Sequence, residues 1–583
     1  MNPLEAKRHT LAHLLAAVIQ KKYPHAKPTI GPAVDTGFYY DFDFSGGATP
    51  TSEDLASLTE EMRALLPTWN SMTGAPVSEA QATEQFAANQ YKKELIQEIT
   101  QRGDTLTLYT AGTFTDLCRG GHSENPATEI APDSFVLDRI AGAYWRGDEK
   151  NPMLTRIYGL AFDTKEALDA YVTQKEEALK RDHRKLGQEL DLFVISDLVG
   201  AGLPLFTPKG TIVRDELISF LWELNKAQGY EKVDIPHLAK PDLYKVSGHW
   251  DKYKDDGFQV HGRDKHYMLK PMNCPHHTQI YASRPKSYRD LPIRYFDVTR
   301  VYRDENSGEL LGLSRVLSIT QDDGHVFCRP DQIADEAGRI ISIIKDFYST
   351  LNMLGEGSYW ARLSVRDPKT PDKYLGDTAI WDAAEAHLEA IASAEGLTMI
   401  RGEGEAAFYG PKLDFMFKDA IGREWQLATI QLDFVQPERF KLEYTDQTGA
   451  KVRPVMIHRA ISGSLERFLS VMIEHYAGAF PAWLSPVQAM VIPVSDKHIE
   501  YAKTVLSALK DADIRADIDD ANDSLGKKIR AAKTEKIPYV LIVGDKEIES
   551  STVTIESRDH GKLDPVSTTE AVVRISKEIR DRA

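Results

Sequence analysis

Cysteine is scarce in this sequence: Cys118, Cys274 and Cys328 are the only three among 583 residues. So few cysteines cannot form a disulfide framework, which favours a reducing cytoplasmic location. The chain also lacks any apolar run near the ~20 residues that a membrane-spanning helix requires. Its first ten residues lack the charged and then apolar regions of a signal peptide. We therefore expect a cytoplasmic protein with no membrane partner.

Positive charge is in deficit, because 71 Lys and Arg residues face 87 Asp and Glu residues, for a net charge of −16. This balance argues against a DNA-binding protein or a general nucleic-acid binder. Any contact with nucleic acid would need local basic patches. The two candidates are K-R-D-H-R-K at 180–185 and K-K-I-R-A-A-K-T-E-K at 527–536. The alternative for each run is a solvated helix face.

A chain of 583 residues is long enough for about three or four domains. Residues 1–162 combine an expected helix at 4–22 with short strands such as 37–44. A charged, alanine-rich stretch at 164–188 has helical spacing and predicts a linker helix, so we assign 163–190 to a linker. Residues 191–484 form a large α+β region, with strands expected at 294–303 and 425–434.

The segment P-A-W-L-S-P at 481–486 marks the next domain boundary. Beyond it, strands expected at 489–494, 513–519 and 539–544 alternate with helices, the second of which is basic. This order predicts βαβ units and a small sheet with some parallel pairing in residues 485–583. The whole chain is therefore expected to be a multidomain α+β protein with a C-terminal α/β domain.

Residues 272–277, M-N-C-P-H-H, place the thiol of Cys274 beside two imidazoles. Cysteine and histidine are zinc ligands, but a zinc motif that can be read from spacing pairs its ligands within a few residues. By itself this segment fits a buried thiol beside surface histidines better than a metal site.

Together with T-Q-D-D-G-H at 320–325 and M-I-H-R-A at 456–460, this segment resembles the catalytic core of the threonyl-tRNA synthetases. The resemblance covers essentially the whole chain. It implies that Cys274, His325 and His458 hold one zinc ion, which grips the amino acid. It also implies a class II catalytic core built on an antiparallel sheet, an N-terminal α+β editing domain and a C-terminal α/β anticodon-binding domain. The match describes a short form of the enzyme that begins at the editing domain.

Two segments resemble the arginine motifs of class II synthetases, V-Y-R-D-E at 301–305 and G-S-L-E-R-F at 463–468. Negative charge builds on the α-phosphate of ATP during adenylate formation, and a guanidinium binds phosphate through a planar fork. The resemblance makes Arg303 the arginine at the α-phosphate and Arg467 the arginine over adenine and the γ-phosphate. It adds Glu305 and Arg315 to the ATP site, with Mg²⁺ accompanying ATP.

Further positions rest on the resemblance alone. Tyr409 and Lys412, in Y-G-P-K-L-D-F, match residues at the substrate amine and at the phosphate. His249, in S-G-H-W, matches a histidine used to transfer threonine to tRNA. Each of these residues has an alternative role as a hydrogen-bonded structural residue. The other expected pocket residues are Gln321, Asp323, Gln431, Met272 and Ser464.

The chemistry of threonine explains why a metal suits this pocket. Valine matches threonine in shape and lacks only the hydroxyl, and a site built to bind that hydroxyl rejects its absence by roughly 10⁴–10⁵-fold. Zinc with three protein ligands keeps positions open for the amine and the hydroxyl of threonine. Asp323 is expected to accept the hydrogen bond of the hydroxyl.

Three positions depart from the family pattern. Ile319 stands where an aromatic residue usually stacks on adenine, and W-Q-L-A-T at 425–429 replaces W-Q-C-G-T. Glu556 stands where the family often has an arginine that contacts a base. None of these changes removes a zinc ligand. They bear on the shape of the ATP site, the floor of the pocket and the reading of the anticodon.

Serine shares the amine and hydroxyl of threonine and lacks only a methyl, which is worth ~1–3 kcal/mol, so a second sieve is expected. An H-x-x-x-H motif on the expected helix at 4–22 places two imidazoles on one face. D-L-C-R-G-G-H at 116–122 adds a C-x-x-x-H motif. By spacing this set could bind metal, whereas the resemblance favours a metal-free editing site in which a histidine activates water. Its expected members are His9, His13, Cys118, His122, Asp116 and Lys92.

The C-terminal region resembles the anticodon-binding domain of class IIa synthetases. G-D-K-E at 544–547 and A-N-D-S-L-G-K-K-I-R at 521–530 match most clearly. Asn522 and Glu547 are the expected base readers. The residues expected to meet phosphate are Lys527, Lys528 and Arg530.

These expectations combine into a homodimeric synthetase. It would activate L-threonine with ATP, transfer it to tRNA(Thr) and hydrolyse mischarged seryl-tRNA(Thr). One alternative is another class II synthetase, such as a prolyl or seryl enzyme, against which the Cys274, His325 and His458 set argues. The other is a non-catalytic tRNA-binding or regulatory protein descended from a synthetase, against which Arg303 and Arg467 argue.

Overall fold

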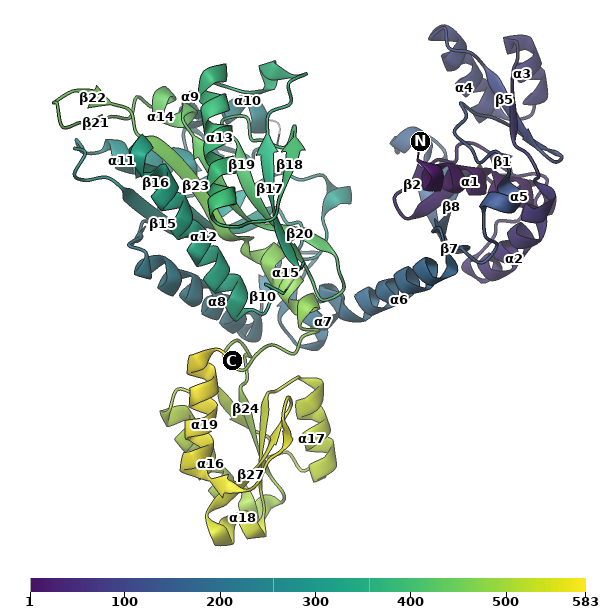
Figure 1. The fold of residues 1–583 in the computed structure, drawn as a ribbon. Helices are drawn as coiled ribbons and strands as arrows, with labels where there is room; N and C mark the ends of the chain where they lie inside the picture. Colours follow the sequence, from purple (N-terminus) through teal and green to yellow (C-terminus); the bar gives the residue numbers. More distant parts are fainter. Residues whose placement is uncertain (1, 255, 356) are drawn as a thin grey trace. The chain divides into compact units, whose positions relative to one another are not determined.

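The computed structural model describes residues 2–254, 256–355 and 357–583, and the chain divides into two compact units, Met1–Glu177 and Ala178–Ala583 (Figure 1). Within the described residues, no helix combines the length and apolar character needed to cross a membrane.

The boundary between the units lies inside α6 (Lys165–Arg181). One helix over 164–188 was expected, but the structure ends α6 at Arg181 and starts α7 (His183–Glu189) after Asp182. Asp182 has φ −49° and ψ 119°, and its side chain accepts a hydrogen bond from the N–H of Arg184. Aspartate is a favoured N-cap, so it ends one helix and starts the next. The prediction of a single linker helix is therefore wrong.

The N-terminal unit is built around α1 (Pro3–Lys22), which packs on a five-stranded sheet. Asn2 and Glu5 form a capping box that starts the helix. Phe38, Tyr40 and Phe42 alternate along β3 (Gly37–Asp43) and are fully buried in the core that includes α1. The predicted helix at 4–22 and strand at 37–44 are confirmed.

The strands of that sheet lie in the order β1 (Lys27–Pro28), β3, β8 (Met153–Ala161) and β7 (Phe135–Tyr144), and β2 (Ala33–Val34) pairs with β3. A second sheet joins β4 (Thr73–Pro76), β5 (Thr107–Ala111) and β6 (Phe114–Leu117). The other helices of the unit are α2 (Leu55–Leu65), α3 (Glu79–Gln85), α4 (Gln90–Gln101) and α5 (Pro126–Glu129).

An eight-stranded sheet forms the centre of the second unit. Neighbouring strands are antiparallel except in the pairs β11–β15 and β17–β18. The predicted antiparallel core and the strands expected at 294–303 and 425–434, now β15 and β20, are confirmed. The order is β11 (Glu231–Lys232), β15 (Ile293–Tyr302), β16 (Ser318–Cys328), β23 (Val455–Ser464), β20 (Glu424–Asp433), β19 (Lys412–Lys418), β17 (Tyr359–Val365) and β18 (Met399–Glu403).

The two faces of this sheet differ because successive side chains of a strand point to opposite sides. One face packs against α8 (Pro208–Ala227), α12 (Ile333–Thr350) and α15 (Leu465–His475) in the largest apolar core. The residues of the central strands that alternate with this apolar set include a group of polar side chains. They are Asp297 and Thr299 of β15, Asp323 and His325 of β16, His458 of β23, Gln431 and Asp433 of β20, and Lys412 and Asp414 of β19.

Short elements surround the polar face. The helices among them are α9 (Pro241–Ser247), α10 (Trp250–Tyr253), α11 (Cys274–Ala282) and α14 (Val435–Arg439). The strands are β12 (Leu238–Ala239), β13 (Gln259–His261) and β14 (His266–Leu269), with the pair β21 (Tyr444–Thr445) and β22 (Lys451–Val452). By contrast, α13 (Thr378–Ala394) and the pair β9 (Phe193–Val194) and β10 (Leu205–Phe206) pack against the large apolar core.

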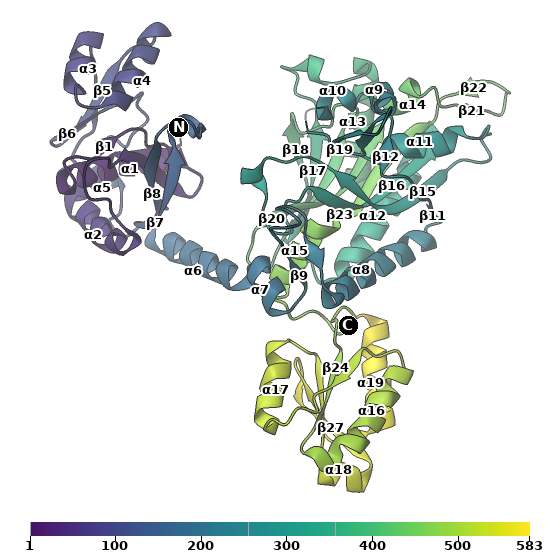
Figure 2. The ribbon, with the colours of Figure 1, turned by 180° about the vertical axis from the view of Figure 1, so that it is seen from behind.

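Residues after the 481–486 segment form a six-stranded sheet with helices on both faces. β24 pairs in parallel with β25 and β26, which confirms the predicted βαβ units. α17 lies on one side of the sheet, and α16 and α19 lie on the other (Figure 2). The elements are β24 (Ala489–Pro493), α16 (Ile499–Asp511), β25 (Ala516–Ile518), α17 (Leu525–Thr534), β26 (Tyr539–Val543), α18 (Asp545–Ser550), β27 (Thr552–Ser557), β28 (Gly561–Lys562), β29 (Val566–Ser567) and α19 (Thr568–Asp581).

Candidate active site and a second polar cluster

Cys274, His325 and His458 converge on the polar face of the large sheet. They come from the start of α11, from β16 and from β23, and all three are buried. One donor atom of each lies within 4.8 Å of the others. His325 and His458 are cross-strand partners, with Nε2 and Nδ1 3.0 Å apart. Antiparallel pairing thus joins residues that no local spacing rule could connect.

The surroundings of these donors suit a zinc ion. The second nitrogen of His458, Nε2, lies 2.8 Å from Asp433 Oδ2, and the second nitrogen of His325, Nδ1, lies 2.7 Å from His277 Nδ1. Metal-binding histidines generally use their second nitrogen in this way. Burial, and then the charge of Asp323, raise the pKa of the Cys274 thiol well above its ordinary value. A divalent cation is the kind of group that stabilises a thiolate at such a place.

His249 lies beside this centre. Its side chain is fully buried, with Nδ1 2.8 Å from Ser247 Oγ and Nε2 3.6 Å from Cys274 Sγ. Burial, followed by the charges of His458 and Arg303, lowers the pKa of His249 to about 3. The imidazole is therefore neutral at physiological pH. The contact with Cys274 could not be read from the S-G-H-W motif.

The two motif arginines lie at the ends of neighbouring elements. Arg303 follows β15, with Nη2 3.1 Å from Met272 Sδ and its guanidinium 5.4 Å from the ring centre of Tyr253. Arg467 is in the first turn of α15, and its Nε donates to the Ser314 carbonyl at 3.2 Å. Burial, and then the charges of Arg315 and Arg303, lower the pKa of Arg467. The positive charges of these arginines therefore act on one another, and an anion bound between them would relieve that repulsion.

The motif segments are fixed to the sheet by a buried carboxylate. Glu466 accepts hydrogen bonds from the N–H and Oγ1 of Thr320 at 2.7 and 2.6 Å, which joins α15 to β16. Ser464 caps α15 by accepting the N–H of Arg467 at 3.2 Å. The sequence assigned Ser464 to substrate, and its cap also orients Arg467. Glu305 Oε2 accepts two bonds from Arg315, at 2.9 and 2.6 Å, so these two expected ATP residues form a pair.

The expected pocket residues share the polar face. Asp323 Oδ2 accepts from Asn273 Nδ2 at 3.0 Å, and Gln431 Nε2 donates to the Gly410 carbonyl at 3.2 Å. The Oε1 atom of Gln321 is buried without a hydrogen-bond partner among the described residues. Such an atom is available to a ligand.

Tyr409 and Lys412 complete the set. The buried Tyr409 ring lies 5.1 Å from that of His458, and burial raises the pKa of Tyr409 well above its ordinary value. Lys412 Nζ lies 3.0 Å from Asp414 Oδ2. Ile319 is the cross-strand partner of Val301, so this departure from the family lies beside the strand that leads to Arg303.

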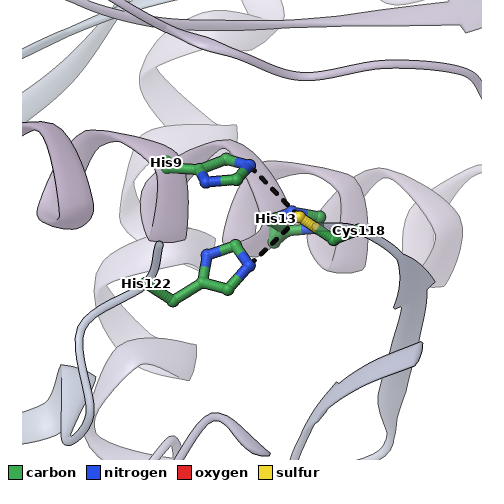
Figure 3. A group of neighbouring side chains, drawn as sticks. All are labelled: His9, His13, Cys118 and His122. Atoms are coloured by element: carbon green, nitrogen blue, oxygen red, sulfur yellow. Dashed lines mark hydrogen bonds between the residues drawn. The ribbon is translucent and has the colours of Figure 1, made fainter. Parts of the chain in front are cut away.

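A second cluster lies wholly within the N-terminal unit (Figure 3). His9 and His13 are one turn apart on α1, and their ring centres lie 5.1 Å apart, which confirms the predicted shared face. Cys118 Sγ lies 3.5 Å from His9 Nε2 and 3.2 Å from His122 Nε2. One donor atom of each of the four lies within 4.8 Å of the others.

The buried carboxylate of Asp116 contacts His13 and two further side chains, Lys92 and Tyr40. Its carboxylate lies 3.1 Å from His13 Nδ1 and 2.5 Å from Lys92 Nζ, and it accepts from Tyr40 Oη at 2.5 Å. Burial disfavours the imidazolium of His13, but Asp116 and then Cys118 outweigh it and raise the pKa of His13 to about 9. Burial also disfavours the Asp116 carboxylate, yet Lys92 and His13 hold its pKa well below the ordinary range. Sequence reasoning missed Tyr40, which lies within the aromatic strand 37–44.

The pKa values of Cys118 and His122 are both lowered, which favours a charged thiolate and a neutral imidazole. Burial disfavours the Cys118 thiolate, but hydrogen bonds from His122, His13 and His9 outweigh it and lower the pKa of Cys118 to about 3. Burial lowers the pKa of His122. The cluster therefore combines a thiolate, an imidazolium and a neutral imidazole. A cavity of about 340 Å³ opens beside it, and its lining includes His9, His13, Tyr40, Lys92 and Cys118.

Parts of the predicted basic patches serve the fold instead. Arg181 Nη1 donates to the carbonyl of His475 at 3.1 Å, at the end of α15. His183 Nδ1 lies 2.7 Å from Glu474 Oε1, and its Nε2 accepts the N–H of Leu313 at 3.1 Å. The prediction of a tRNA patch at 180–185 is wrong for His183, because that residue is buried between α7 and the end of α15.

The anticodon candidates differ in their environments. Lys528, an expected phosphate contact, is 5% exposed, and its Nζ donates to the Asp519 carbonyl at 3.0 Å, so that prediction is wrong. Lys527 pairs with Asp523 at 2.8 Å on the surface, and Asn522 and Arg530 are exposed. Glu547 accepts from the N–H of Gly544 at 3.0 Å and from Thr554 Oγ1 at 2.8 Å. Glu556 pairs with Lys533 at 2.5 Å.

Two family models match the chain. Residues 258–476 match the tRNA synthetase class II core domain (G, H, P, S and T), and residues 488–578 match an anticodon binding domain. Among similar proteins, the Threonine--tRNA ligase of Gloeobacter violaceus is 47% identical over 585 residues, which span 99% of this chain and 92% of that protein. The Threonine--tRNA ligase of Rubrobacter xylanophilus is 48% identical over 557 residues, which span 95% of this chain and 85% of that protein.

Two solved structures resemble the chain. The first is described as the RNA binding domain of threonyl-tRNA synthetase from Cryptosporidium parvum Iowa II. It has a TM-score of 0.65 and 36% identity, and the match covers 68% of this chain and 98% of that one. The second, the putative threonyl-tRNA synthetase ThrRS-1 from Aeropyrum pernix, has a TM-score of 0.62 and 29% identity, and the match covers 69% of this chain and 97% of that one.

Proposed function

The chain belongs to the threonine--tRNA ligases, and we propose that it joins L-threonine to tRNA(Thr) through a threonyl-adenylate formed from ATP. The observation that carries this proposal is the convergence of Cys274, His325 and His458 on the polar face of a class II sheet. A prolyl or seryl enzyme would not need these three donors in this arrangement. A non-catalytic descendant would not need two motif arginines held beside the same pocket.

The reaction places each expected residue in a role. When bound, a zinc ion at Cys274, His325 and His458 would act as a Lewis acid for the amine and hydroxyl of threonine. Asp323 accepts the hydrogen bond of that hydroxyl, and it is already held in place by Asn273. Tyr409, Gln431 and Gln321 line the same face and orient the amine and the carboxylate.

Adenylate formation needs positively charged side chains at the phosphates of ATP. A carboxylate oxygen of threonine attacks the α-phosphorus of ATP, and pyrophosphate leaves. Arg303 stabilises the negative charge that grows on the α-phosphate, assisted by Lys412, and Arg467 holds adenine and the γ-phosphate. Glu305, Arg315 and Ser464 complete the ATP site, while Met272 packs against Arg303. Mg²⁺ enters with ATP.

The second step transfers threonine to tRNA. A hydroxyl of the 3′-terminal ribose attacks the carbonyl carbon of the adenylate, and AMP leaves. His249 remains our candidate for handling a proton in this step. Its pKa of about 3 makes it a neutral and weakly basic imidazole, which suits it to orient or relay a proton and not to hold one.

We assign the N-terminal cluster to hydrolysis of seryl-tRNA(Thr). The neutral imidazole of His122 suits a base that activates water, and the imidazolium of His13 suits stabilisation of the developing oxyanion. Asp116 holds that imidazolium, and Lys92 in turn pairs with Asp116. We propose a metal-free site, as the family resemblance implies, although one donor atom each of His9, His13, Cys118 and His122 also lies within 4.8 Å of the others.

The remaining assignments follow the family. We propose the domain limits 1–162 for editing, 163–190 for the linker, 191–484 for catalysis and 485–583 for anticodon binding, with Asn522 and Glu547 as base readers. We further propose a cytoplasmic homodimer.

The metal and the activity are tested on one purified sample. Wild type should hold one zinc per chain and charge tRNA(Thr) with threonine. Cys274→Ser should lose both, because the thiolate supplies one of three ligands, whereas Cys328→Ser, a change at a cysteine outside the site, should lose neither. Full threonine activation by rigorously metal-free protein would overturn the metal centre. Zinc content without any charging would instead favour the non-catalytic alternative.

A further inference from the structure

The two histidines of the metal centre are supported unequally. His458 Nε2 lies 2.8 Å from Asp433 Oδ2. Asp433 is itself held by the N–H groups of Val435 and Gln436, at 2.8 and 2.9 Å, and by Gln436 Nε2 at 2.8 Å. This is the carboxylate support usual for a metal-binding imidazole. His325 has no carboxylate at its second nitrogen among the described residues and meets the imidazole of His277 there instead.

His277 belongs to the M-N-C-P-H-H segment but has no role in the proposed reaction. It is fully buried on α11, three residues after Cys274, and its ring meets that of His325 edge to face, at 4.6 Å and 89°. The two Nδ1 atoms are 2.7 Å apart. At that distance one nitrogen must donate and the other must accept.

Zinc binding by His325 would fix which of the two Nδ1 atoms carries the proton of this hydrogen bond. A ligand needs a free lone pair, and the Nε2 atom of His325 faces His458 Nδ1 at 3.0 Å, in the donor cluster. The proton of neutral His325 must therefore sit on Nδ1, since a neutral imidazole carries only one. His325 then donates to His277, and the proton of His277 must sit on its Nε2.

A buried carboxylate lies on the far side of His277. Its Nε2 is 4.0 Å from Asp297 Oδ2, and neither atom has a hydrogen-bond partner among the described residues. The separation is too long for a hydrogen bond. It nevertheless places an unpaired acceptor oxygen on the side to which the N–H of His277 must point, which favours the same tautomer.

We propose that His277 is a positioning residue for the metal centre: it accepts the Nδ1 proton of His325 and so fixes the tautomer and the ring orientation that present Nε2 to zinc, with Asp297 selecting the matching tautomer of His277. This inference rests on the proposed zinc centre. It adds a residue that acts on the metal only through a ligand, and it explains why a second histidine follows Cys274 so closely.

The chain offers a matched control at the next position. His276 is also a buried imidazole on α11, and its two ring nitrogens have no hydrogen-bond partner among the described residues. Replacement of either histidine by phenylalanine keeps a ring of similar shape in the helix. Only the change at His277 removes an acceptor that faces a ligand.

The test measures zinc affinity of the full-length protein by competition with a chromophoric chelator. His277→Phe should weaken zinc binding by about 10–100-fold, the usual effect of losing a partner of a metal-binding histidine. His277→Asn keeps an acceptor oxygen near the lost nitrogen and should recover most of the affinity, and His276→Phe should match wild type. Asp297→Asn should weaken binding less than His277→Phe.

A second readout separates positioning from general damage. The cobalt-substituted protein should show a shifted absorption spectrum in His277→Phe and the wild-type spectrum in His276→Phe. If His277→Phe does not fold, His277→Ala takes its place and the same loss is required. Unchanged zinc affinity and an unchanged cobalt spectrum in the His277 variant would overturn the inference. A wild-type protein that binds no zinc would overturn the metal centre itself, and this inference with it.

Discussion

Arg303 carries the most direct prediction at the scale of single residues. Its guanidinium meets only a thioether and an aromatic ring among the described side chains, and its buried Nε has no hydrogen-bond partner there. A charge left without a carboxylate partner is available to the α-phosphate. Arg303→Ala should lower the rate of threonine-dependent pyrophosphate exchange by about 10²–10³-fold. Zinc content should stay at the wild-type level. A rate within a few-fold of wild type would remove Arg303 from the phosphate.

Cys118 gives a prediction in pH. Its pKa of about 3 keeps it a thiolate throughout the physiological range. The rate of alkylation of Cys118 should therefore be flat between about pH 5 and pH 8, whereas an ordinary thiol loses about tenfold in rate per pH unit below its pKa. His13→Leu removes one of the stabilising partners and should restore part of that slope. A wild-type rate that falls tenfold per unit from pH 8 would contradict the assigned charges.

The pKa of His13 predicts how the stability of the fold changes with pH. Its folded pKa of about 9 is above the ordinary value of 6.5. The stabilisation that the imidazolium contributes is thus fully present below pH 6.5 and is lost as the pH rises through about 9. Asp116→Asn should lower the pKa of His13, which histidine-selective NMR can follow. A His13 pKa that is unaffected by this change would contradict the pairing.

Single residues also show how far sequence reasoning extends. The family motifs identified Cys274, His325 and His458, and the structure brings them together. No motif gave a role to Asp433 or to His277, because their roles depend on which side of a ring faces the cluster. Side-chain direction of this kind is set by strand register and helix orientation, which the sequence does not display. The burial of Lys528 was missed for the same reason.

At the scale of elements, the end of β23, where the strand leads directly into α15, is a sensitive point. Gly463 has φ +69°, and a Cβ there would lie 2.7 Å from the carbonyl oxygen of Leu427 on β20. Gly463→Ala should therefore displace α15 and Arg467 and reduce pyrophosphate exchange. The strained φ alone costs about 1–2 kcal/mol.

Gly449 is the matched control for Gly463. It has φ +89°, but a Cβ added there would meet no heavy atom within 4 Å, so Gly449→Ala carries the backbone strain without the clash. Thermal denaturation should show a smaller loss for Gly449→Ala than for Gly463→Ala, with full exchange activity. Equal losses of stability and activity in the two variants would show that the contact with β20 has no special role.

The sequence predicted the position and type of helices and strands better than the residues at which they end. The strands β3, β15 and β20 were expected from the sequence, and the order of elements identified the C-terminal βαβ units. The linker was misjudged because helical spacing continues through Asp182, and only the cap interaction with Arg184 reveals the break. Helix ends depend on such local hydrogen bonds, which composition and spacing do not show.

At the scale of the whole molecule, the editing and catalytic clusters lie in different compact units. His13→Ala, or Cys118→Ala combined with His122→Ala, should leave threonine charging unchanged and should allow seryl-tRNA to accumulate. The measurement is deacylation of pre-formed seryl-tRNA(Thr), with and without a chelator. Clearance at the wild-type rate by the variants would mean that the cluster does not edit. Clearance abolished by the chelator would mean that the four residues bind metal.

The central claim is that this chain activates threonine, and pyrophosphate exchange with a panel of amino acids tests it most directly. Threonine should support exchange best. Serine should be weaker by about 10–200-fold, because it lacks one methyl, and valine by roughly 10⁴–10⁵-fold, because it lacks the hydroxyl that the site binds. Proline should support none. Exchange that is strongest with serine or proline, or absent with every amino acid, would contradict the account.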